Sequence, residues 1–311
     1  MATPRKPPGI FPRLVRDYSQ QRPGRRRLAS HALGGLVVLV LAACAGGDPR
    51  HRLGEAAAAA DMTVAEIPAG GFAITTARRV RAPGAAVRVY VEGDGYAWRD
   101  RNTPSADPTP RRATGLALAI ADPGPNVIYL ARPCQYSLDR SPACEAALWT
   151  DRRFSEEVIA SLDGVLDRLL AASPGLPLEL VGYSGGGAVA ALLAARRAGV
   201  SSLRTVAGNL DHVLLNRLHG VSPMPGSLNA ADVAQALATL PQIHYVGAHD
   251  PIVAPDIAES FAGRMADRNC VRVERVAGTT HEQGWEAAWP VLLRTVPTCG
   301  SGPVTAPAPA R

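Results

Sequence analysis

Three residues whose side chains could together perform nucleophilic chemistry occur along the chain in the order Ser184, Asp250 and His281. Ser184 stands among glycines in the run GYSGGG, between an apolar run of strand type and an alanine-rich run of helix type. A serine at such a turn projects its hydroxyl group, and the first N–H groups of the following helix face any anion that forms beside it. Because a serine hydroxyl is a weak nucleophile at neutral pH, it needs a base, here His281, and a carboxylate that orients the base.

Both partners of the serine have competitors. Asp250 follows a predicted strand and is the first candidate for the acid, whereas Asp211, which follows the preceding strand, is the alternative acid. The histidines that compete with His281 are His212, His219, His244 and His249. His244 lies inside a predicted strand, which favours a place in the core.

Strand and helix patterns alternate along most of the chain. Apolar runs predict strands over residues 63–67, 72–80, 87–92, 127–131, 178–181, 203–207, 243–246 and 271–276. Helices are predicted over residues 114–121, 155–172, 230–240, 255–268 and 282–295, and after Ser184. This alternation predicts an α/β fold, with a mostly parallel central sheet, helices on both faces and an antiparallel edge. Sites in such sheets form at the carboxyl ends of the strands.

The order Ser184, Asp250, His281, with G-Y-S-G-G at the turn, resembles the α/β-hydrolase family. The resemblance covers about residues 63–296 and implies the α/β-hydrolase fold, a Ser-His-Asp triad and an acyl-serine intermediate, with no metal or organic cofactor required. By the same resemblance, the oxyanion of the tetrahedral intermediate accepts hydrogen bonds from the N–H of Gly185 and from that of Asp94 or Gly95. These last two lie in the run EGDG, where many members have a His-Gly-Gly-Gly-like run.

Residues 1–43 are expected to form a lipoprotein-type signal peptide. A basic segment is followed by a short apolar run, and the run ends in LAAC, which resembles the bacterial lipobox. Cys44 is therefore the expected lipidation site, which would anchor an exported protein in the cell envelope. The alternatives are a secretory signal cut after Ala45 or an uncleaved membrane anchor. Residues 44–61 are expected to be a flexible tether, residues 62–299 the folded domain and residues 300–311 a disordered tail.

The positive charge of the chain belongs to this leader. The net charge is +6, yet from Cys44 onward 25 basic residues face 26 acidic ones. The folded domain therefore has no bulk attraction to polyanions, and no nucleic-acid partner is expected.

Four cysteines follow Cys44 in the chain: Cys134, Cys144, Cys270 and Cys299. An even number in an exported protein favours disulfides, and the pairs Cys134–Cys144 and Cys270–Cys299 close the shortest loops. Buried free thiols are the alternative, and no cysteine or histidine spacing indicates a metal site.

The favoured function is a serine hydrolase that cleaves an ester, or less readily an amide. The segment 208–242 does not alternate and is expected to be a cap-like insertion over the site or a surface loop, with Asn229 capping its helix. Three other functions remain open: a ligand- or partner-binding envelope protein without catalysis, an acyltransferase with the same triad, and dinucleotide binding. The last rests on G-G-G-A-V-A, which fits G-x-G-x-x-A and is followed by Asp211. Neither the substrate nor the oligomeric state is readable from the sequence.

Overall fold

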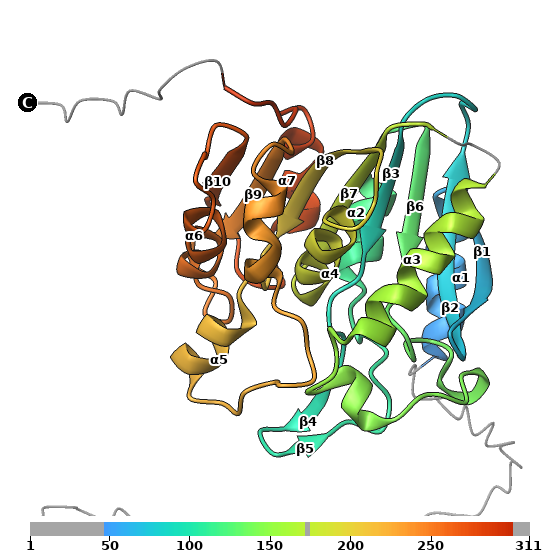
Figure 1. Ribbon diagram of the computed structural model, residues 1–311. Helices are drawn as coiled ribbons and strands as arrows, with labels where there is room; N and C mark the ends of the chain where they lie inside the picture. The colour runs from blue at the N-terminus through green and yellow to red at the C-terminus, as the bar shows by residue number, and fades with distance from the viewer. Residues whose placement is uncertain (1–46, 172–174, 301–311) are drawn as a thin grey trace, which may run out of the picture. The chain divides into compact units, whose positions relative to one another are not determined.

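The computed structural model describes residues 47–171 and 175–300 (Figure 1). The expected signal peptide over residues 1–43, the lipidation candidate Cys44 and residues 301–311 of the expected tail lie outside the described residues. Among the helices that are described, none has both the length and the apolar character needed to cross a bilayer.

Eight strands form the central sheet in the order β1-β2-β6-β3-β7-β8-β9-β10 (Figure 1). Their bounds are β1 Thr63–Ala69, β2 Phe72–Val80, β3 Val87–Val91, β6 Asn126–Leu130, β7 Leu178–Tyr183, β8 Val200–Val206, β9 Gln242–Gly247 and β10 Val271–Val276. Six neighbouring strands run parallel: β6, β3, β7, β8, β9 and β10. Strands β1 and β2 add an antiparallel edge. The prediction of a mostly parallel sheet with an antiparallel edge is confirmed. A separate small hairpin pairs β4 (Trp98–Asp100) with β5 (Thr103–Pro104).

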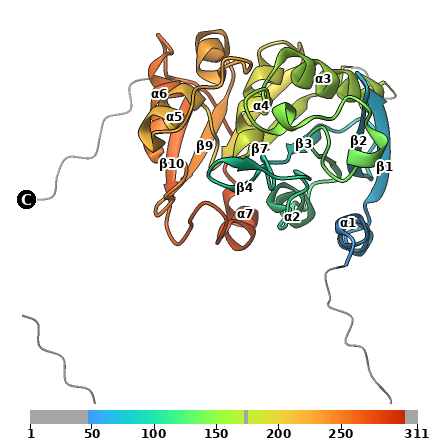
Figure 2. The same cartoon turned by 90° about the horizontal axis from the view of Figure 1, so that it is seen from below.

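Helices cover both faces of the sheet (Figure 2). One face carries α3 (Glu156–Leu170), α4 (Gly185–Ala194) and α6 (Pro255–Gly263), and the other carries α1 (Pro49–Ala59), α2 (Thr114–Ala121) and α7 (Trp285–Leu292). Because side chains alternate along a strand, Val89 and Leu180 enter the core on the α4 side, whereas Tyr90 and Val181 enter the core on the opposite side. The sheet thus separates two apolar cores.

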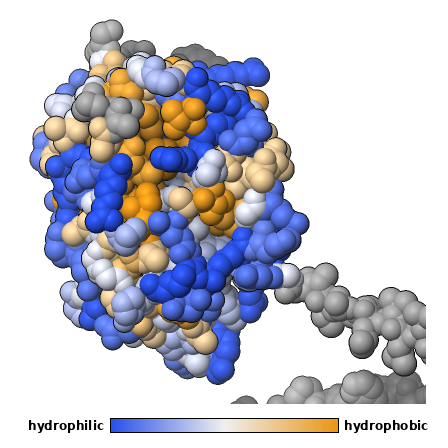
Figure 3. Space-filling view, turned by 90° about the vertical axis from the view of Figure 1, so that its right-hand side faces the viewer, coloured by the Kyte–Doolittle hydropathy of each residue, from blue (hydrophilic) through white to orange (hydrophobic). Residues whose placement is uncertain are grey.

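Strand β1 forms one edge of the sheet and pairs only with β2 among the described strands. A band of hydrophobic side chains runs between hydrophilic ones on the face of the molecule that carries this edge (Figure 3), and Val64 of β1 is 39% exposed. Pro68 lacks an N–H to offer another strand, and Glu66 is charged and paired with Arg140. These residues limit the pairing of the edge with other chains.

Residues 49–59 form helix α1, so the expected flexible tether over residues 44–61 is wrong for this part. Asp48 caps the helix by accepting a hydrogen bond from the Arg50 N–H, and Pro49 occupies its first position. Leu53 and Ala57 are buried in the core beside α2. Alanine favours helix, and a short helix of this kind is stable when its apolar face packs against the protein core, as the face of α1 does here.

The segment 208–242 is not a cap over Ser184. It contains α5 (His212–His219) and a 3-10 helix over Ala230–Leu237, and it packs beside α4 and α6. No residue of the segment lines the hollow that contains Ser184. Asn229 occupies the N-cap position of the 3-10 helix, as expected. Its side chain makes no capping hydrogen bond, because the amide bonds to Asp211 and to the N–H of His212 instead.

Candidate active site

Ser184 sits at a strained turn between β7 and α4. Its φ of 51° and ψ of −121° lie in a region that side-chain-bearing residues rarely adopt. The turn is held by close packing, because a methyl group on Gly186 would overlap the carbonyl oxygens of Val91 and Glu92. The Ser184 hydroxyl therefore stands at the carboxyl edge of the sheet, beside the N-terminus of α4.

A chain of hydrogen bonds links Ser184, His281 and Asp250. The Ser184 Oγ lies 3.0 Å from the His281 Nε2, and the His281 Nδ1 lies 2.9 Å from the Asp250 Oδ2. The three residues follow strands β7, β10 and β9, and both His281 and Asp250 are buried. A neutral imidazole that donates its Nδ1–H to Asp250 leaves Nε2 free to accept the proton of the Ser184 hydroxyl.

Neighbouring groups fix the acid and the histidine. The Asp250 Oδ1 accepts hydrogen bonds from the N–H groups of Ile252 and Val253, both at 2.8 Å, which leaves Oδ2 to face the imidazole. The His281 carbonyl oxygen accepts from the Tyr183 hydroxyl and from the Trp285 indole, each at 3.1 Å. The Tyr183 ring also packs against the imidazole, with centroids 5.7 Å apart. Tyr183 and Trp285 thus hold the histidine in place, a role that their aromatic character alone did not indicate.

Gly185 and the loop that carries Asp94 meet beside Ser184. Gly185 is the first residue of α4, where the helix supplies no acceptor for the backbone N–H. Within the described part of the chain, the N–H groups of Asp94 and Gly95 have no hydrogen-bond acceptor. The Asp94 carboxylate accepts from Arg132 Nη1 at 3.2 Å and from Arg153 Nη1 at 3.0 Å. The structure therefore leaves the donors expected of the oxyanion site unpaired.

Glu92, which was not among the candidate site residues, anchors the loop that carries Asp94. Its side chain is buried and accepts hydrogen bonds from the N–H groups of Gly93, Gly115 and Leu116 and from the Tyr129 hydroxyl. Burial raises the pKa of Glu92, and these hydrogen bonds oppose the shift. The signal in the sequence is an acidic residue directly after the apolar run VRVYV, where a buried charge needs donors nearby.

The alternative acid Asp211 lies away from His281. Its Oδ1 accepts from the Leu214 N–H, which makes Asp211 the N-cap of α5, and its Oδ2 accepts from the Ser260 hydroxyl. These hydrogen bonds lower the pKa of Asp211 against the opposing effect of burial. Asp211 therefore stabilises the 208–242 segment.

The competing histidines also lie elsewhere. His244 is buried in β9, where its ring nitrogens contact Thr205 Oγ1 and Gln242 Oε1, and burial lowers its pKa to about 3. His219 and His249 are exposed, and His212 is buried on α5. Among the hydrogen bonds of the described residues, Ser184 Oγ meets only one imidazole, that of His281.

A hollow of about 600 Å³ opens above Ser184 and His281. Its walls combine apolar side chains, including Trp98 and Ile252, with charged ones. The Arg111 guanidinium lies 3.6 Å from the centroid of the Tyr96 ring in the same wall. A hollow of this size accommodates a small organic substrate with both apolar and polar parts.

Both expected disulfides are present, Cys134–Cys144 and Cys270–Cys299. The first is connected to the site through Gln135, whose side-chain amide donates to the Gly93 carbonyl at 3.0 Å. This disulfide therefore also braces the loop that carries Asp94.

Solved structures with a similar fold were found, although no family model matches the chain and no curated protein matches its sequence. An α/β serine hydrolase homologue from Coxiella burnetii aligns with a TM-score of 0.50 at 14% identity, covering 75% of this chain and 93% of its own. A dienelactone hydrolase from Anabaena variabilis aligns with a TM-score of 0.50 at 15% identity, covering 75% and 94%. A putative lipase from Acinetobacter baumannii aligns with a TM-score of 0.50 at 12% identity, covering 79% and 93%. The chain has the α/β-hydrolase fold.

Proposed function

We propose that the protein is a serine hydrolase that cleaves a carboxylic ester through an acyl intermediate on Ser184. The observation that carries the proposal is the hydrogen-bonded chain from Ser184 through His281 to Asp250, at 3.0 and 2.9 Å. The names of the similar structures, which include a serine hydrolase homologue, a dienelactone hydrolase and a putative lipase, are in keeping with this activity.

In the proposed reaction, Ser184 Oγ attacks the ester carbonyl carbon while its proton passes to His281 Nε2. The Asp250 carboxylate stabilises the imidazolium that forms. The oxyanion of the tetrahedral intermediate accepts hydrogen bonds from the N–H of Gly185 and from that of Asp94 or Gly95. When the intermediate collapses, the alcohol leaves with the proton of His281.

Water completes the cycle. It attacks the acyl carbon of the intermediate, and His281 takes its proton. The second tetrahedral intermediate releases the carboxylic acid and returns the proton to Ser184 Oγ. None of these steps calls on a metal ion or an organic cofactor.

A series of p-nitrophenyl esters with increasing acyl length tests this proposal. We expect turnover by the parent protein and a loss of about 10⁶-fold in kcat for Ser184→Ala, with folding checked by circular dichroism. A folded parent protein that turns over none of the esters would point to a ligand-binding protein without catalysis. If an added alcohol captured the acyl group in preference to water, the protein would be an acyltransferase.

The proposal extends to location, as an exported protein that Cys44 anchors to a membrane of the cell envelope through lipid. The sequence LAAC after a basic segment and an apolar run supports this part of the proposal. Metabolic labelling with a fatty-acid analogue should mark the parent protein and not Cys44→Ala. An unmarked parent protein would contradict lipidation.

A further inference from the structure

Three large apolar side chains stay exposed beside the hollow that contains Ser184, and together they are called the apolar rim. Trp98 of the β4–β5 hairpin, Val221 after α5 and Ile252 after β9 are 41%, 44% and 46% exposed. Trp98 and Ile252 line the hollow, and Trp98 and Val221 line an adjoining cavity of about 460 Å³. Apolar side chains that gather on one face and remain exposed mark an interaction surface, unlike single ones scattered over the protein.

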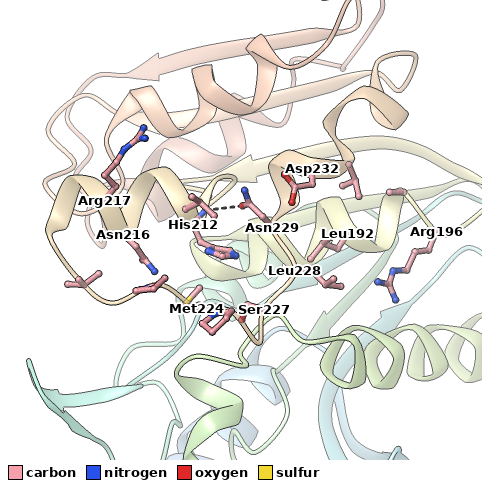
Figure 4. Close-up of a pocket in the computed structure, with 16 residues that line it drawn as sticks. Leu192, Arg196, His212, Asn216, Arg217, Met224, Ser227, Leu228, Asn229 and Asp232 are labelled. Atoms are coloured by element: carbon pink, nitrogen blue, oxygen red, sulfur yellow. Dashed lines mark hydrogen bonds between the residues drawn. The ribbon is translucent and has the colours of Figure 1, made fainter.

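Contacts between segments far apart in the chain hold the apolar rim together. The His219 imidazole donates from Nε2 to the Ile252 carbonyl oxygen at 2.7 Å, which ties the end of α5 to the loop after β9. The Arg101 guanidinium lies 3.5 Å from the His219 carbonyl oxygen, which ties the hairpin to α5. The adjoining cavity is also lined by Asn216 and Met224, and Figure 4 shows Asn216 on α5 and Met224 on the loop that follows it. All three segments follow strands of the parallel sheet at its carboxyl edge.

The unpaired charges in the walls of the hollow and the adjoining cavity balance one another. Within the described part of the chain, Arg101 and Arg111 have no ion-pair partner, and neither have Asp151 and Glu282. The surface therefore has no excess positive charge that would attract a polyanion. Apolar side chains among charges of both signs fit the boundary of a lipid bilayer, where headgroups lie over hydrocarbon.

The chain before α1 determines which side of the domain can face a membrane. Gly47 is the first described residue, and Cys44 precedes it by three residues, which span at most about 11 Å when fully extended. The apolar run that would serve as an uncleaved anchor ends one residue earlier. A folded domain of about 250 residues has a radius of gyration of about 18 Å. A tether this short therefore keeps the surface around Gly47 close to the bilayer.

The start of α1 lies on the same side of the molecule as the hollow. Pro49, the first residue of α1, lines a small groove together with Pro110 and Arg111. Pro110 and Arg111 also line the hollow that contains Ser184. Figure 1 shows the β4–β5 hairpin and α5 together at the lower side of the molecule. A bilayer within reach of the anchor thus lies on the side where the hollow and the apolar rim open.

We propose that the apolar rim docks on the phospholipid bilayer that carries the N-terminal anchor, so that the hollow above Ser184 opens toward the lipid surface. Trp98, Val221 and Ile252 then pass from water into the boundary between headgroups and acyl chains, where tryptophan is favoured. The inference rests on the proposed anchoring of the chain at Cys44 or just before it, and it does not depend on hydrolysis.

Tryptophan fluorescence tests the docking, because Trp98 is exposed whereas Trp149, Trp285 and Trp289 are buried. Ser184→Ala protein is purified from the membrane fraction of expressing cells and placed in phosphatidylcholine vesicles, with or without bromine on the upper part of the acyl chains. The emission that disappears in Trp98→Phe belongs to Trp98, and we expect bromine to quench it. Protein that is absent from the membrane fraction, or Trp98 emission that bromine leaves unchanged, would overturn the proposal.

A tryptophan at the opposite edge of the sheet is the matched control. Val80 ends β2 beside Asn126, where β6 begins, and it is 53% exposed. Trp98→Phe combined with Val80→Trp keeps four tryptophans, and bromine should leave its emission unchanged. Equal quenching of the two reporters would show a domain that turns freely on its tether, which contradicts docking.

A carboxylate on the apolar rim should weaken the docking, because a charge is costly among acyl chains. We expect Val221→Asp to reduce the quenching of Trp98 and Val80→Asp to preserve it. Trp98 emission that shifts with the ratio of protein to lipid, but that bromine does not quench, would assign the apolar rim to a second copy of the chain and overturn the proposal. Because Ser184 is absent from this protein, none of these results bears on the proposed hydrolysis, and fatty-acid labelling of Cys44 tests the anchor separately.

Discussion

The Asp94 carboxylate lies against the Cα of Gly185, so closely that a methyl group at Gly185 would overlap it. The carboxylate is fixed in this position by ion pairs to Arg132 and Arg153. This contact joins the loop after β3 to the start of α4, the two segments that carry the proposed oxyanion donors. The spacing of those donors is therefore set by how closely Asp94 and Gly185 approach.

Gly185→Ala should move the two donors apart. The added methyl group must displace Asp94 or the first turn of α4, and we expect kcat for ester hydrolysis to fall by about 10²- to 10³-fold, the cost of losing one oxyanion donor. Gly164→Ala in α3 is the control, because nothing lies within 4 Å of the added methyl group. It should leave kcat unchanged and raise the free energy of unfolding by up to about 1 kcal/mol. Equal kcat values for the two variants would refute the importance of the contact.

Asp250→Asn should affect catalysis, whereas Asp211→Asn should affect stability. Asp250 faces His281, so its amide variant should lose about 10⁴-fold in kcat through the wrong imidazole tautomer, as is usual for such acids. The amide of Asp211→Asn can still cap α5, but it loses the charge that pairs with Arg264 and accepts from Ser260, so the free energy of unfolding should fall by about 1 kcal/mol while kcat stays near the parent value. Steady-state kinetics combined with urea unfolding separates the two effects. A crippled Asp211→Asn enzyme beside an active Asp250→Asn enzyme would reverse the assignment.

The two disulfides should differ in their effect on catalysis. Replacing both cysteines of Cys134–Cys144 with serine loosens the segment whose Gln135 holds Gly93, and we expect kcat to fall by about ten- to 100-fold. Replacing those of Cys270–Cys299, which joins the start of β10 to residue 299, should lower stability by about 2–4 kcal/mol with kcat unchanged. The assay uses the same ester for both double variants at a temperature where both are folded. A larger loss of kcat from the second pair than from the first would argue against bracing of the site by Gln135.

His244 should make the stability of the fold depend on pH. Its pKa is about 3 in the folded protein and near 6.5 when unfolded, so the unfolded chain binds one more proton between these values. The stabilising effect of the neutral ring is complete above about pH 6.5 and is lost as the pH falls toward 3. The free energy of unfolding, measured in urea at pH 6 and at pH 5, should fall more steeply with decreasing pH in the parent protein than in His244→Asn. The difference should reach up to about 1.4 kcal/mol per pH unit. Parallel slopes would show that His244 is not the group responsible.

Much of the fold could be predicted from local patterns. The apolar spacing in residues 155–172 matches the buried face of α3, where Val158, Leu162 and Val165 pack into the core. The glycines around Ser184 likewise indicated a strand-to-helix turn. These features depend on neighbours in sequence, which is why they are readable without the structure.

The choice between the two acids depends on sheet order and could not be read in this way. Asp211 and Asp250 both follow strands, but β9 lies directly beside β10, so the loops that carry Asp250 and His281 meet. The loop after β8 leads instead into α5, whose first turn uses Asp211 as its cap. A helical run directly after Asp211 was the available signal for that role.

Packing against distant segments explains the other differences. Helix α1 forms where a tether was expected because Leu53 and Ala57 find a core surface beside α2. The segment 208–242 lies beside α4 and α6, although its irregular composition was equally compatible with a cap over the site. In both cases the deciding surface belongs to residues far away in the chain.

Labelling with a fluorophosphonate probe tests the central claim most directly, because the probe reacts with a serine only when a neighbouring base activates it. Intact-mass measurement of the parent protein should show one added probe, and peptide mapping should place it on Ser184. Ser184→Ala should remain unlabelled, and His281→Ala should react far more slowly. A folded parent protein that stays unlabelled, or that carries the probe on another serine, would contradict the account.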